Sequence, residues 1–252
     1  MLSVENISIQ FGGLKAVSDF NLTINSKEIV GLIGPNGAGK TTVFNMLTGV
    51  YNPTDGKICY LGEEIHGLKP YTITKKKIAR TFQNIRLFST LSVVDNVKIS
   101  FNYMIDYNIV DSIFRTPRFK KEEKEIEEKS IKLLKAFNLD DKKDEMAKNL
   151  SYGEQRRLEI VRALATNPSL LLLDEPAAGM NPKETYELMN MIEWIKNEFK
   201  ISVLLIEHDM KLVMGVCEKI VVLDYGKKIA EGTPSEIKIN PKVIKAYLGE
   251  GA

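Results

Sequence analysis

The sequence predicts an α/β fold in which a mostly parallel sheet carries an N-terminal antiparallel β region and an inserted α-helical region. The first observation is a set of short apolar runs that end in polar or glycine residues, at 28–34, 170–176 and 201–209. Such runs are typical of strands buried on both faces, as in a parallel sheet packed between helices. The second observation is the alternation of apolar and polar residues over 2–11 and 19–27, which predicts strands with one buried face. The third is the helical pattern of residues 86–150.

The remaining elements follow from periodicity and capping residues. Residues 120–139 combine many charged residues with spaced apolar ones and predict a helix with a solvated face. A second helix is expected over 181–199, since Asn181 is a favourable N-cap and Glu184 completes a capping box. Residues 219–234 are interpreted as two strands around a tight turn.

The bulk composition excludes several classes of function. The chain has 252 residues, a net charge of +2, 44% hydrophobic and 27% charged residues, as is ordinary for a soluble globular protein. The balanced charge gives no reason to expect a nucleic-acid partner. Cys59 and Cys217 lack metal-ligand spacing and are interpreted as buried thiols in a reducing compartment. No apolar run approaches the roughly 20 residues of a membrane-spanning helix, so any spanning part must come from another chain.

Residues 34–41 read GPNGAGKT, a complete G-x-x-x-x-G-K-T phosphate loop. The motif stands between an apolar strand and a helix predicted over 41–50, which is the context it requires. Its glycines let backbone N–H groups surround phosphate oxygens, Lys40 reaches the β- and γ-phosphates, and the Thr41 hydroxyl binds Mg²⁺. The chain is therefore expected to bind a nucleoside triphosphate.

Two neighbouring apolar runs end in residues suited to hydrolysis. LLLLDEP ends in Asp174, which can hold Mg²⁺ through its water shell, and Glu175, which can polarise the attacking water. His208 ends the next run. If the two strands are parallel, the imidazole emerges at the same sheet edge and can hydrogen-bond a γ-phosphate oxygen. A lone histidine is more often structural, so this assignment depends on the position of His208.

The stretch LSYGEQRRLEI, residues 150–160, begins another helix and admits two interpretations. Ser151 and Glu154 form a capping box, which is sufficient for a plain helix start. The box leaves Gly153 unexplained, because a glycine inside a helix costs about 0.5–1 kcal/mol relative to alanine. A helix start also carries free N–H groups and a partial positive charge, which attract an anion. A plain cap and a phosphate site both remain open.

The motifs GPNGAGKT, LSYGEQRR, LLLLDEP and IEHD, in this order and at these separations, resemble the ATP-binding subunit of ABC transporters. The resemblance covers essentially the whole chain. LSYGEQ is similar to the signature sequence of the family, which commonly reads L-S-G-G-Q, although Tyr152 replaces a glycine and Glu154 precedes Gln155.

The resemblance implies a single ABC ATPase domain, with a P-loop NTPase core. In this interpretation, residues 1–85 and 151–252 form the RecA-like core with its antiparallel β subdomain, and residues 86–150 form the helical subdomain.

The resemblance also implies how ATP is held. In the family, two ATP-binding subunits pack head to tail, and the signature helix of one caps the γ-phosphate bound by the other, so Ser151 and Gly153 are expected to bind a partner's ATP. Gln83 matches a glutamine that contacts Mg²⁺ and the attacking water. Phe11 stands where the family stacks an aromatic ring on adenine, with a buried strand-end phenylalanine as the alternative.

The full set of implied site residues falls into three groups. The ATP contacts are Phe11, Gly34, Asn36, Gly37, Ala38, Gly39, Lys40, Thr41, Thr42, Ser151, Gly153 and Gln155. The Mg²⁺ ligands are Thr41, Gln83 and Asp174, and the catalytic residues are Glu175, His208 and Gln83.

The partners that the resemblance implies are transmembrane permease subunits, a second ATP-binding subunit and, indirectly, a periplasmic or extracellular solute-binding protein. The second ATP-binding subunit is a copy of this chain or a relative. No nucleic acid is implied. The expected location is cytoplasmic, peripheral on the inner face of the cell membrane.

Three segments favour one branch of the family. EPAAGMNPKET, the extended stretch 101–125 and the ending KVIKAYLGEG resemble the ATPase of branched-chain (hydrophobic) amino-acid importers, in which ATP-driven dimer closure and hydrolysis-driven opening power transport. The ATPases of urea or amide importers and of lipopolysaccharide export are similar enough to remain open. A non-transport ABC ATPase acting on ribosomes or DNA is disfavoured by the single ATPase unit and the balanced charge. A small-molecule kinase would have no use for LSYGEQ.

Overall fold

A computed structural model of the chain describes residues 1–248 and divides into two compact units. The first unit comprises Met1–Gln83 and Ser169–Ala252, and the second comprises Asn84–Pro168. The last three residues of the C-terminal stretch KVIKAYLGEG lie outside the described residues.

The division differs from the predicted one at residues 84–85 and 151–168, which the sequence analysis had assigned to the core. The difference arises because helix α6 (Tyr152–Ala165) packs against α3 (Val93–Lys98) and α5 (Pro117–Ala136), both of which belong to the second unit. The division after Gln83 places this residue at the point where the chain leaves the first unit.

The first unit is built on a six-stranded sheet with the strand order β10-β9-β3-β8-β7-β6. All neighbouring strands are parallel except the edge pair of β9 and β10, which is antiparallel. The strands are β3 (Ile29–Ile33), β6 (Ile78–Arg80), β7 (Leu170–Asp174), β8 (Ser202–Ile206), β9 (Lys219–Asp224) and β10 (Lys227–Gly232). Strands β3, β7 and β8 are fully buried, as the apolar runs predict.

A second sheet contains four strands in the order β2-β1-β4-β5, all antiparallel. Its strands are β1 (Leu2–Phe11), β2 (Leu14–Ile24), β4 (Asp55–Tyr60) and β5 (Glu63–Glu64). This arrangement confirms the predicted fold class, a mostly parallel sheet with an N-terminal antiparallel β region.

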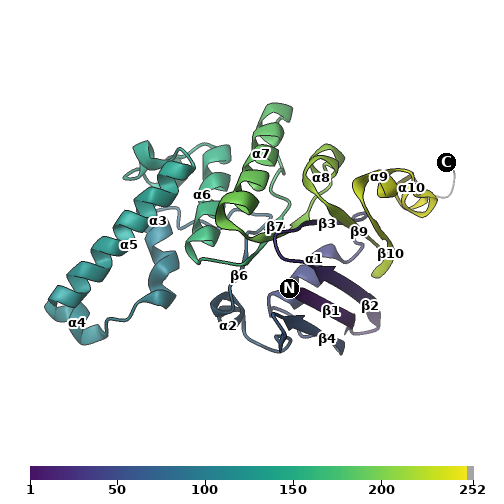
Figure 1. Cartoon of the computed structure of the whole chain (residues 1–252), viewed down its shortest axis with the longest axis horizontal. Coiled ribbons are helices and arrows are strands. Elements are labelled where there is room, and N and C mark those ends of the chain that lie inside the picture. Colours follow the sequence, from purple (N-terminus) through teal and green to yellow (C-terminus); the bar gives the residue numbers. More distant parts are fainter. Residues whose placement is uncertain (249–252) are drawn as a thin grey trace. The chain divides into compact units, whose positions relative to one another are not determined.

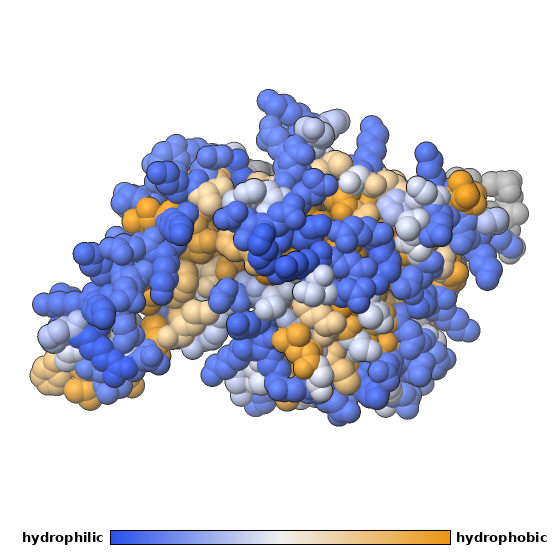
Figure 2. Space-filling model, viewed as in Figure 1, coloured by the Kyte–Doolittle hydropathy of each residue, from blue (hydrophilic) through white to orange (hydrophobic). Residues whose placement is uncertain are grey.

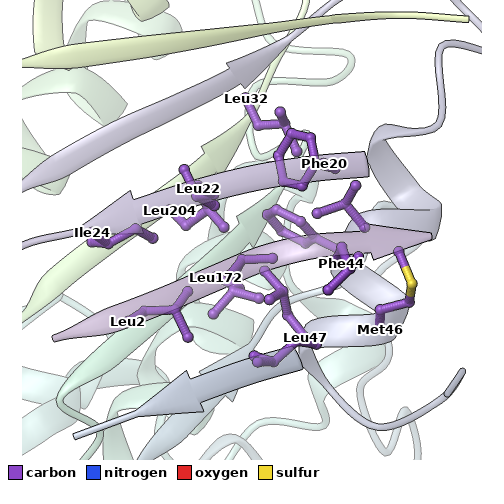
Figure 3. Close-up of a cluster of buried hydrophobic side chains, with 14 of the residues drawn as sticks. Leu2, Phe20, Leu22, Ile24, Leu32, Phe44, Met46, Leu47, Leu172 and Leu204 are labelled. Atoms are coloured by element: carbon purple, nitrogen blue, oxygen red, sulfur yellow. The ribbon is translucent and has the colours of Figure 1, made fainter. Parts of the chain in front are cut away.

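One hydrophobic cluster joins the two sheets through helix α1 (Lys40–Leu47). Figure 3 shows Leu2, Phe20, Leu22 and Ile24 of the antiparallel sheet pointing toward Phe44, Met46 and Leu47 of α1 and toward Leu32, Leu172 and Leu204 of the parallel strands. Alternate residues of each parallel strand enter this cluster, because side chains alternate between the two faces of a sheet. The opposite face meets α8 (Met210–Val216): a Cβ on Gly31 would stand 3.4 Å from Val213 Cγ1 of this helix.

The other helices of the first unit are short except for α7. They are α2 (Pro70–Lys75), α7 (Pro182–Phe199), α9 (Pro234–Lys238) and α10 (Pro241–Leu248). Figure 1 shows α7 and α8 on one side of the parallel sheet, with α1 and strands β1, β2 and β4 on the other. The N-cap of α7 is Asn181, and its capping box with Glu184 confirms the predicted helix start.

The second unit is helical, as the sequence predicts for residues 86–150. Besides α3, α5 and α6 it contains α4 (Ile109–Phe114) and the short 3₁₀ helices η1 (Ile99–Met104), η2 (Asp140–Lys142) and η3 (Ala147–Asn149). Within residues 1–248, no helix is both long enough and apolar enough to cross a membrane. Both cysteines are free; Cys217 is buried, as expected, whereas Cys59 is only partly buried.

Candidate nucleotide-binding site

The phosphate loop connects β3 to α1 through backbone conformations that only glycine adopts easily. Gly34 and Gly39 have φ values of 152° and 105°, and a Cβ at these positions would stand 1.9 Å from Leu223 O and 2.8 Å from Ala16 O. Gly39 is the N-cap of α1, and no side chain caps this helix start. The first N–H groups of α1 therefore point outward without a side-chain acceptor, which is the arrangement that binds phosphate.

Lys40 opens α1, and its side chain is nearly buried. Its ammonium group donates hydrogen bonds to the carbonyl oxygens of Gly34 (2.7 Å) and Pro35 (2.9 Å), so the side chain folds back over its own loop. Burial lowers the pKa of Lys40, and the carboxylates of Glu175 and Asp174 oppose that shift. A phosphate beside this ammonium group would supply a full negative charge and thereby stabilise its protonated form.

Glu175 follows β7 directly, and two predicted site residues hold its carboxylate. Gln83 Nε2 donates to Glu175 Oε2 over 2.6 Å, and His208 Nε2 lies 2.6 Å from Glu175 Oε1. Strands β7 and β8 are parallel neighbours, as the prediction required, so Glu175 and His208 emerge at the same edge of the sheet. The two contacts orient the carboxylate from both sides, which is how a general base is positioned.

Glu175, His208 and the phosphate loop line one pocket with a volume of about 220 Å³. Its lining consists of Asn36, Gly37, Ala38, Gly39, Lys40, Thr41, Thr42, Glu175 and His208. All nine were predicted as site residues, from three stretches that are far apart in the sequence. The pocket therefore combines open N–H groups, a cation and a carboxylate, which together can bind a phosphate chain and activate water.

Arg80 contacts a predicted site residue, although no sequence pattern predicts this contact. Its guanidinium lies 2.6 Å from Asp174 Oδ2, and both side chains are almost entirely buried. The same guanidinium donates to Asn45 Oδ1 of α1 over 2.8 Å and lies over the rings of Phe44 and Phe82. Arg80 thus orients the carboxylate of the predicted Mg²⁺ ligand. Nothing near Arg80 in the sequence marks it, because its partner is 94 positions away.

Glu207 is a second missed residue, directly before His208. This buried carboxylate accepts hydrogen bonds from the N–H groups of Ala177 (2.7 Å) and His208 (3.0 Å). Burial raises the pKa of Glu207, and the hydrogen bonds oppose that rise. Glu207 therefore ties the segment after Glu175 to the backbone of His208. An acid directly after the apolar residues of a buried strand was the available signal.

Phe11 lies at the end of β1 and is 44% exposed, which contradicts the alternative of a buried strand-end side chain. Its ring meets Tyr51, just after α1, edge to face at 5.1 Å. Tyr51 was not among the predicted residues, since nothing in its sequence context indicates a ligand. An exposed, braced aromatic ring is suited to stacking on a base.

In the second unit, the start of α6 is capped by its own residues. Ser151 is the N-cap, its Oγ accepts from the N–H of Glu154, and its own N–H and Oγ donate to Glu154 Oε2 over 2.9 and 2.8 Å. Lys142 lies 2.6 Å from the other oxygen of Glu154. These contacts, led by Lys142, lower the pKa of Glu154 to about 2. The predicted capping box is therefore present, with a lysine added to it.

Other residues near the start of α6 make contacts that stabilise this helix start. Gln155 Nε2 donates to Leu150 O over 2.9 Å. Tyr152, which replaces a glycine of the signature pattern, places its ring above the guanidinium of the fully buried Arg156. Arg156 in turn pairs with Glu159 at 2.8 Å. The start of α6 thus has a defined conformation, with Ser151 exposed at its tip.

Comparison with known proteins decides the family. The sequence profile of the ABC transporter family matches residues 17–178, and a profile described as branched-chain amino acid ATP-binding cassette transporter matches residues 227–252. The chain belongs to the ABC transporter family. It is 49% identical to the high-affinity branched-chain amino acid transport ATP-binding protein BraF of Pseudomonas aeruginosa, over 99% of this chain and 98% of that protein.

Solved structures of ABC cassettes show the same fold. The ADP conformation of MJ1267, an ATP-binding cassette of an ABC transporter, has a TM-score of 0.86 and 31% identity and covers 99% of both chains. A dimeric post-hydrolysis structure of the cassette MJ0796, bound to ADP and Pi, has a TM-score of 0.77 and 25% identity and covers 93% of this chain and 99% of that one. As an ABC ATPase the chain binds ATP, and the phosphate-loop pocket is its candidate site.

Proposed function

We propose that this ABC ATPase hydrolyses ATP for an importer of branched-chain amino acids, on the inner face of the cell membrane. Two findings support the substrate class: the profile over residues 227–252 and the similarity to BraF. The proposed partners are transmembrane permease subunits, a second ATP-binding subunit and, through the permease, an external solute-binding protein.

One observation carries the proposed chemistry: the Glu175 carboxylate, held by Gln83 and His208, lines the phosphate-loop pocket. The carboxylate accepts a proton from the attacking water. His208 is half exposed, so its imidazole can turn from Glu175 to a γ-phosphate oxygen. Gln83 ends the first unit, so its hold on Glu175 can report the state of the site to the helical unit.

The residues at this site also fit Mg²⁺. The Thr41 hydroxyl, the Gln83 amide oxygen and the Asp174 carboxylate are the hard oxygen donors that Mg²⁺ prefers, with substrate phosphates supplying further ligands. Within residues 1–248, no group of three or more His, Cys, Asp or Glu side chains could hold a metal ion. When bound at the phosphate loop, the ion would neutralise charge on the phosphates.

We further propose that Ser151, Gly153 and Gln155 complete the site of the second ATP-binding subunit. The exposed start of α6 supports this role, and the dimeric MJ0796 cassette is a precedent among similar structures. A γ-phosphate shared by two chains makes closure of the dimer depend on ATP, and hydrolysis then removes that contact.

The test uses Glu175→Gln, which keeps the size of the side chain and one acceptor oxygen but removes the base. We expect this variant to bind ATP normally and to turn over at least about 100-fold more slowly than the unmodified chain. Turnover within about threefold of the unmodified chain would refute Glu175 as the base.

The dimer is tested by light scattering of Glu175→Gln with Mg-ATP and with ADP. A dimer is expected only with ATP, and Ser151→Arg is expected to abolish it. A dimer that survives Ser151→Arg would refute the role of α6. If only monomers form, the same measurement is made after mixing with the partner ATPase encoded with the same permease.

The substrate class is tested by reconstitution with the permease subunits and the solute-binding protein. Leucine, isoleucine and valine are expected to stimulate ATP hydrolysis and to accumulate inside proteoliposomes. If only urea or a short-chain amide stimulates ATP hydrolysis, the protein belongs to an importer of that solute instead.

A further inference from the structure

Helix α4 of the second unit exposes an apolar face that the described residues of this unit leave uncovered. Its four large apolar side chains are Ile109, Val110, Ile113 and Phe114, exposed by 79%, 59%, 70% and 76%. None of the six residues of α4 is buried. Figure 2 shows the resulting orange patch over the position that α4 occupies in Figure 1. Single exposed apolar residues are normal, but four on one short helix are not.

The exposed face is held in place by hydrogen bonds on the opposite side of α4. Asn108 and Asp111 form a capping box at the helix start, and Thr116 Oγ1 donates to Asp111 over 2.9 Å beyond its end. Ser112 Oγ donates to Asn108 O. The polar groups of this segment are therefore satisfied internally, although a helix of six residues has little stability by itself. The apolar face needs no hydrogen-bonding partner from outside.

The approach to α4 is braced as well. Tyr107 meets Phe119 of α5 edge to face at 5.0 Å, and its hydroxyl donates to Glu123 over 2.7 Å. Glu122 accepts from the N–H of Asp106 and pairs with Arg118. The segment is thus a structured hairpin that presents one apolar end.

The residues that follow α4 are basic. Positions 115–121 read RTPRFKK, with four cations and no acid, and Arg115, Arg118, Lys120 and Lys121 are all exposed. The carboxylate of Asp111, the acid on α4 itself, accepts from the N–H of Asn108 and the hydroxyl of Thr116. An apolar face beside a cationic segment matches the border between acyl chains and anionic headgroups of a bilayer.

We propose that α4 is a membrane-surface anchor, in which Ile109, Val110, Ile113 and Phe114 enter the interface of an anionic bilayer while Arg115, Lys120 and Lys121 contact its headgroups. This inference rests on the proposed location at the inner face of the membrane. It does not depend on ATP hydrolysis. The anchor would hold the helical unit against the bilayer beside the permease.

The experiment is flotation of the whole chain with vesicles of phosphatidylcholine alone, or with about one third phosphatidylglycerol, at low and high salt. The unmodified chain is expected to float with the anionic vesicles, and less so at high salt. Ile113→Ser with Phe114→Ser should lower the partition coefficient at least about tenfold, because two apolar side chains no longer enter the bilayer. Lys120→Gln with Lys121→Gln should lower it about fivefold or more, on anionic vesicles only.

Matched control variants distinguish binding through α4 from non-specific binding of other exposed side chains to the vesicles. Ile239→Ser removes an isoleucine of similar exposure from the first unit, and Lys129→Gln with Lys132→Gln removes two exposed cations from the far half of α5. Both controls should leave partitioning unchanged. All these variants should keep normal ATPase activity, which also shows that they are folded.

A second measurement reads insertion directly. The single tryptophan, Trp194, is changed to Phe, and the substitution Phe114→Trp then introduces the only indole of the chain. The emission of this indole should shift to the blue with anionic vesicles and be quenched by brominated acyl chains.

Several results would overturn the anchor. They are failure of the unmodified chain to float, flotation that the α4 variants do not reduce, and an emission of the Phe114→Trp chain that vesicles leave unshifted. Loss of assembly with the permease at unchanged partitioning would assign the face to a protein partner instead. Self-association that Ile113→Ser with Phe114→Ser removes, without any vesicle binding, would assign it to a second copy. None of these outcomes bears on Glu175→Gln, so the proposed ATPase chemistry is judged separately.

Discussion

The helix starts of α1 and α6, both proposed to bind phosphate, differ in what stands at their N–H groups. The start of α1 has a left-handed glycine as N-cap and no side-chain cap, so its donors are open. The start of α6 is closed by Ser151 and Glu154, with Lys142 on the far oxygen of the carboxylate. The Glu154 carboxylate accepts from the N–H and the hydroxyl of Ser151, one of the residues proposed to bind a partner's γ-phosphate.

The difference suggests a division of labour. The open start of α1 can bind ATP in a single chain, whereas the start of α6 must exchange or share its hold on Ser151 before it meets a partner's γ-phosphate. Weak engagement in the absence of ATP and firm engagement with it would make the dimer a sensitive reporter of the γ-phosphate.

The largest expected effect comes from the ion pairs next to the two helix starts, Arg80 with Asp174 and Lys142 with Glu154. Arg80→Ala removes the cation from the buried Asp174 carboxylate and should destabilise the fold by about 3–5 kcal/mol in urea titrations. Lys142→Ala removes the partner of Glu154 at the start of α6, where both side chains keep part of their contact with water and the charge is partly screened, and should lower the urea midpoint much less. Equal losses would show that the two sites are not distinguished by burial.

The second prediction exchanges glycine for alanine at each helix start. Gly39→Ala forces a Cβ to 2.8 Å from Ala16 O at positive φ, and should weaken ATP binding by about 2 kcal/mol or more. Gly153→Ala lies within an ordinary helical turn and should leave ATP binding to the monomer unchanged. Calorimetry in the Glu175→Gln background measures both. A comparable loss of ATP affinity in the two variants would show that the starts of α1 and α6 do not differ in how they bind ATP in the monomer.

The third prediction concerns the base of ATP, which only the α1 site would contact. Phe11→Ala should weaken ATP binding by about 1–3 kcal/mol, because a stacking surface is lost. Binding of tripolyphosphate, which lacks the purine, should not change and serves as the control. If both ligands weaken equally, Phe11 supports the fold rather than the base.

The smallest effect is the pH dependence of the α6 cap. The pKa of Glu154 is lowered from 4.5 to about 2 in the folded chain, so its charged contacts contribute stability above pH 4.5 and lose it as the pH falls toward 2. Glu154→Gln keeps a capping box without the charge. The difference in melting temperature between the two chains should be constant above pH 4.5 and shrink below it. A difference in melting temperature that persists near pH 2 would show that the effect of Glu154 comes from side-chain packing and not from its charge.

Much of the fold was predictable because its signals are local. The phosphate loop, the cap at Ser151 and the cap at Asn181 are each encoded within a few residues by turn and capping chemistry. The buried strands were recognisable from continuous apolar runs. The unit boundary was placed at 150 rather than 168, because capping chemistry locates the start of α6 but not the unit it packs in.

The sequence by itself determined the α/β class and which residues could bind phosphate, since both depend on residue types at short spacing. Only the tertiary structure decided which side chains meet. Gln83 reaches Glu175 across 92 positions, and Arg80 reaches Asp174 across 94, because β6 and β7 are parallel neighbours. It also decided that α4 turns its apolar face outward, since an apolar run looks the same in sequence whether or not a neighbour covers it. Contacts over long separations depend on strand order and register, which no local pattern specifies.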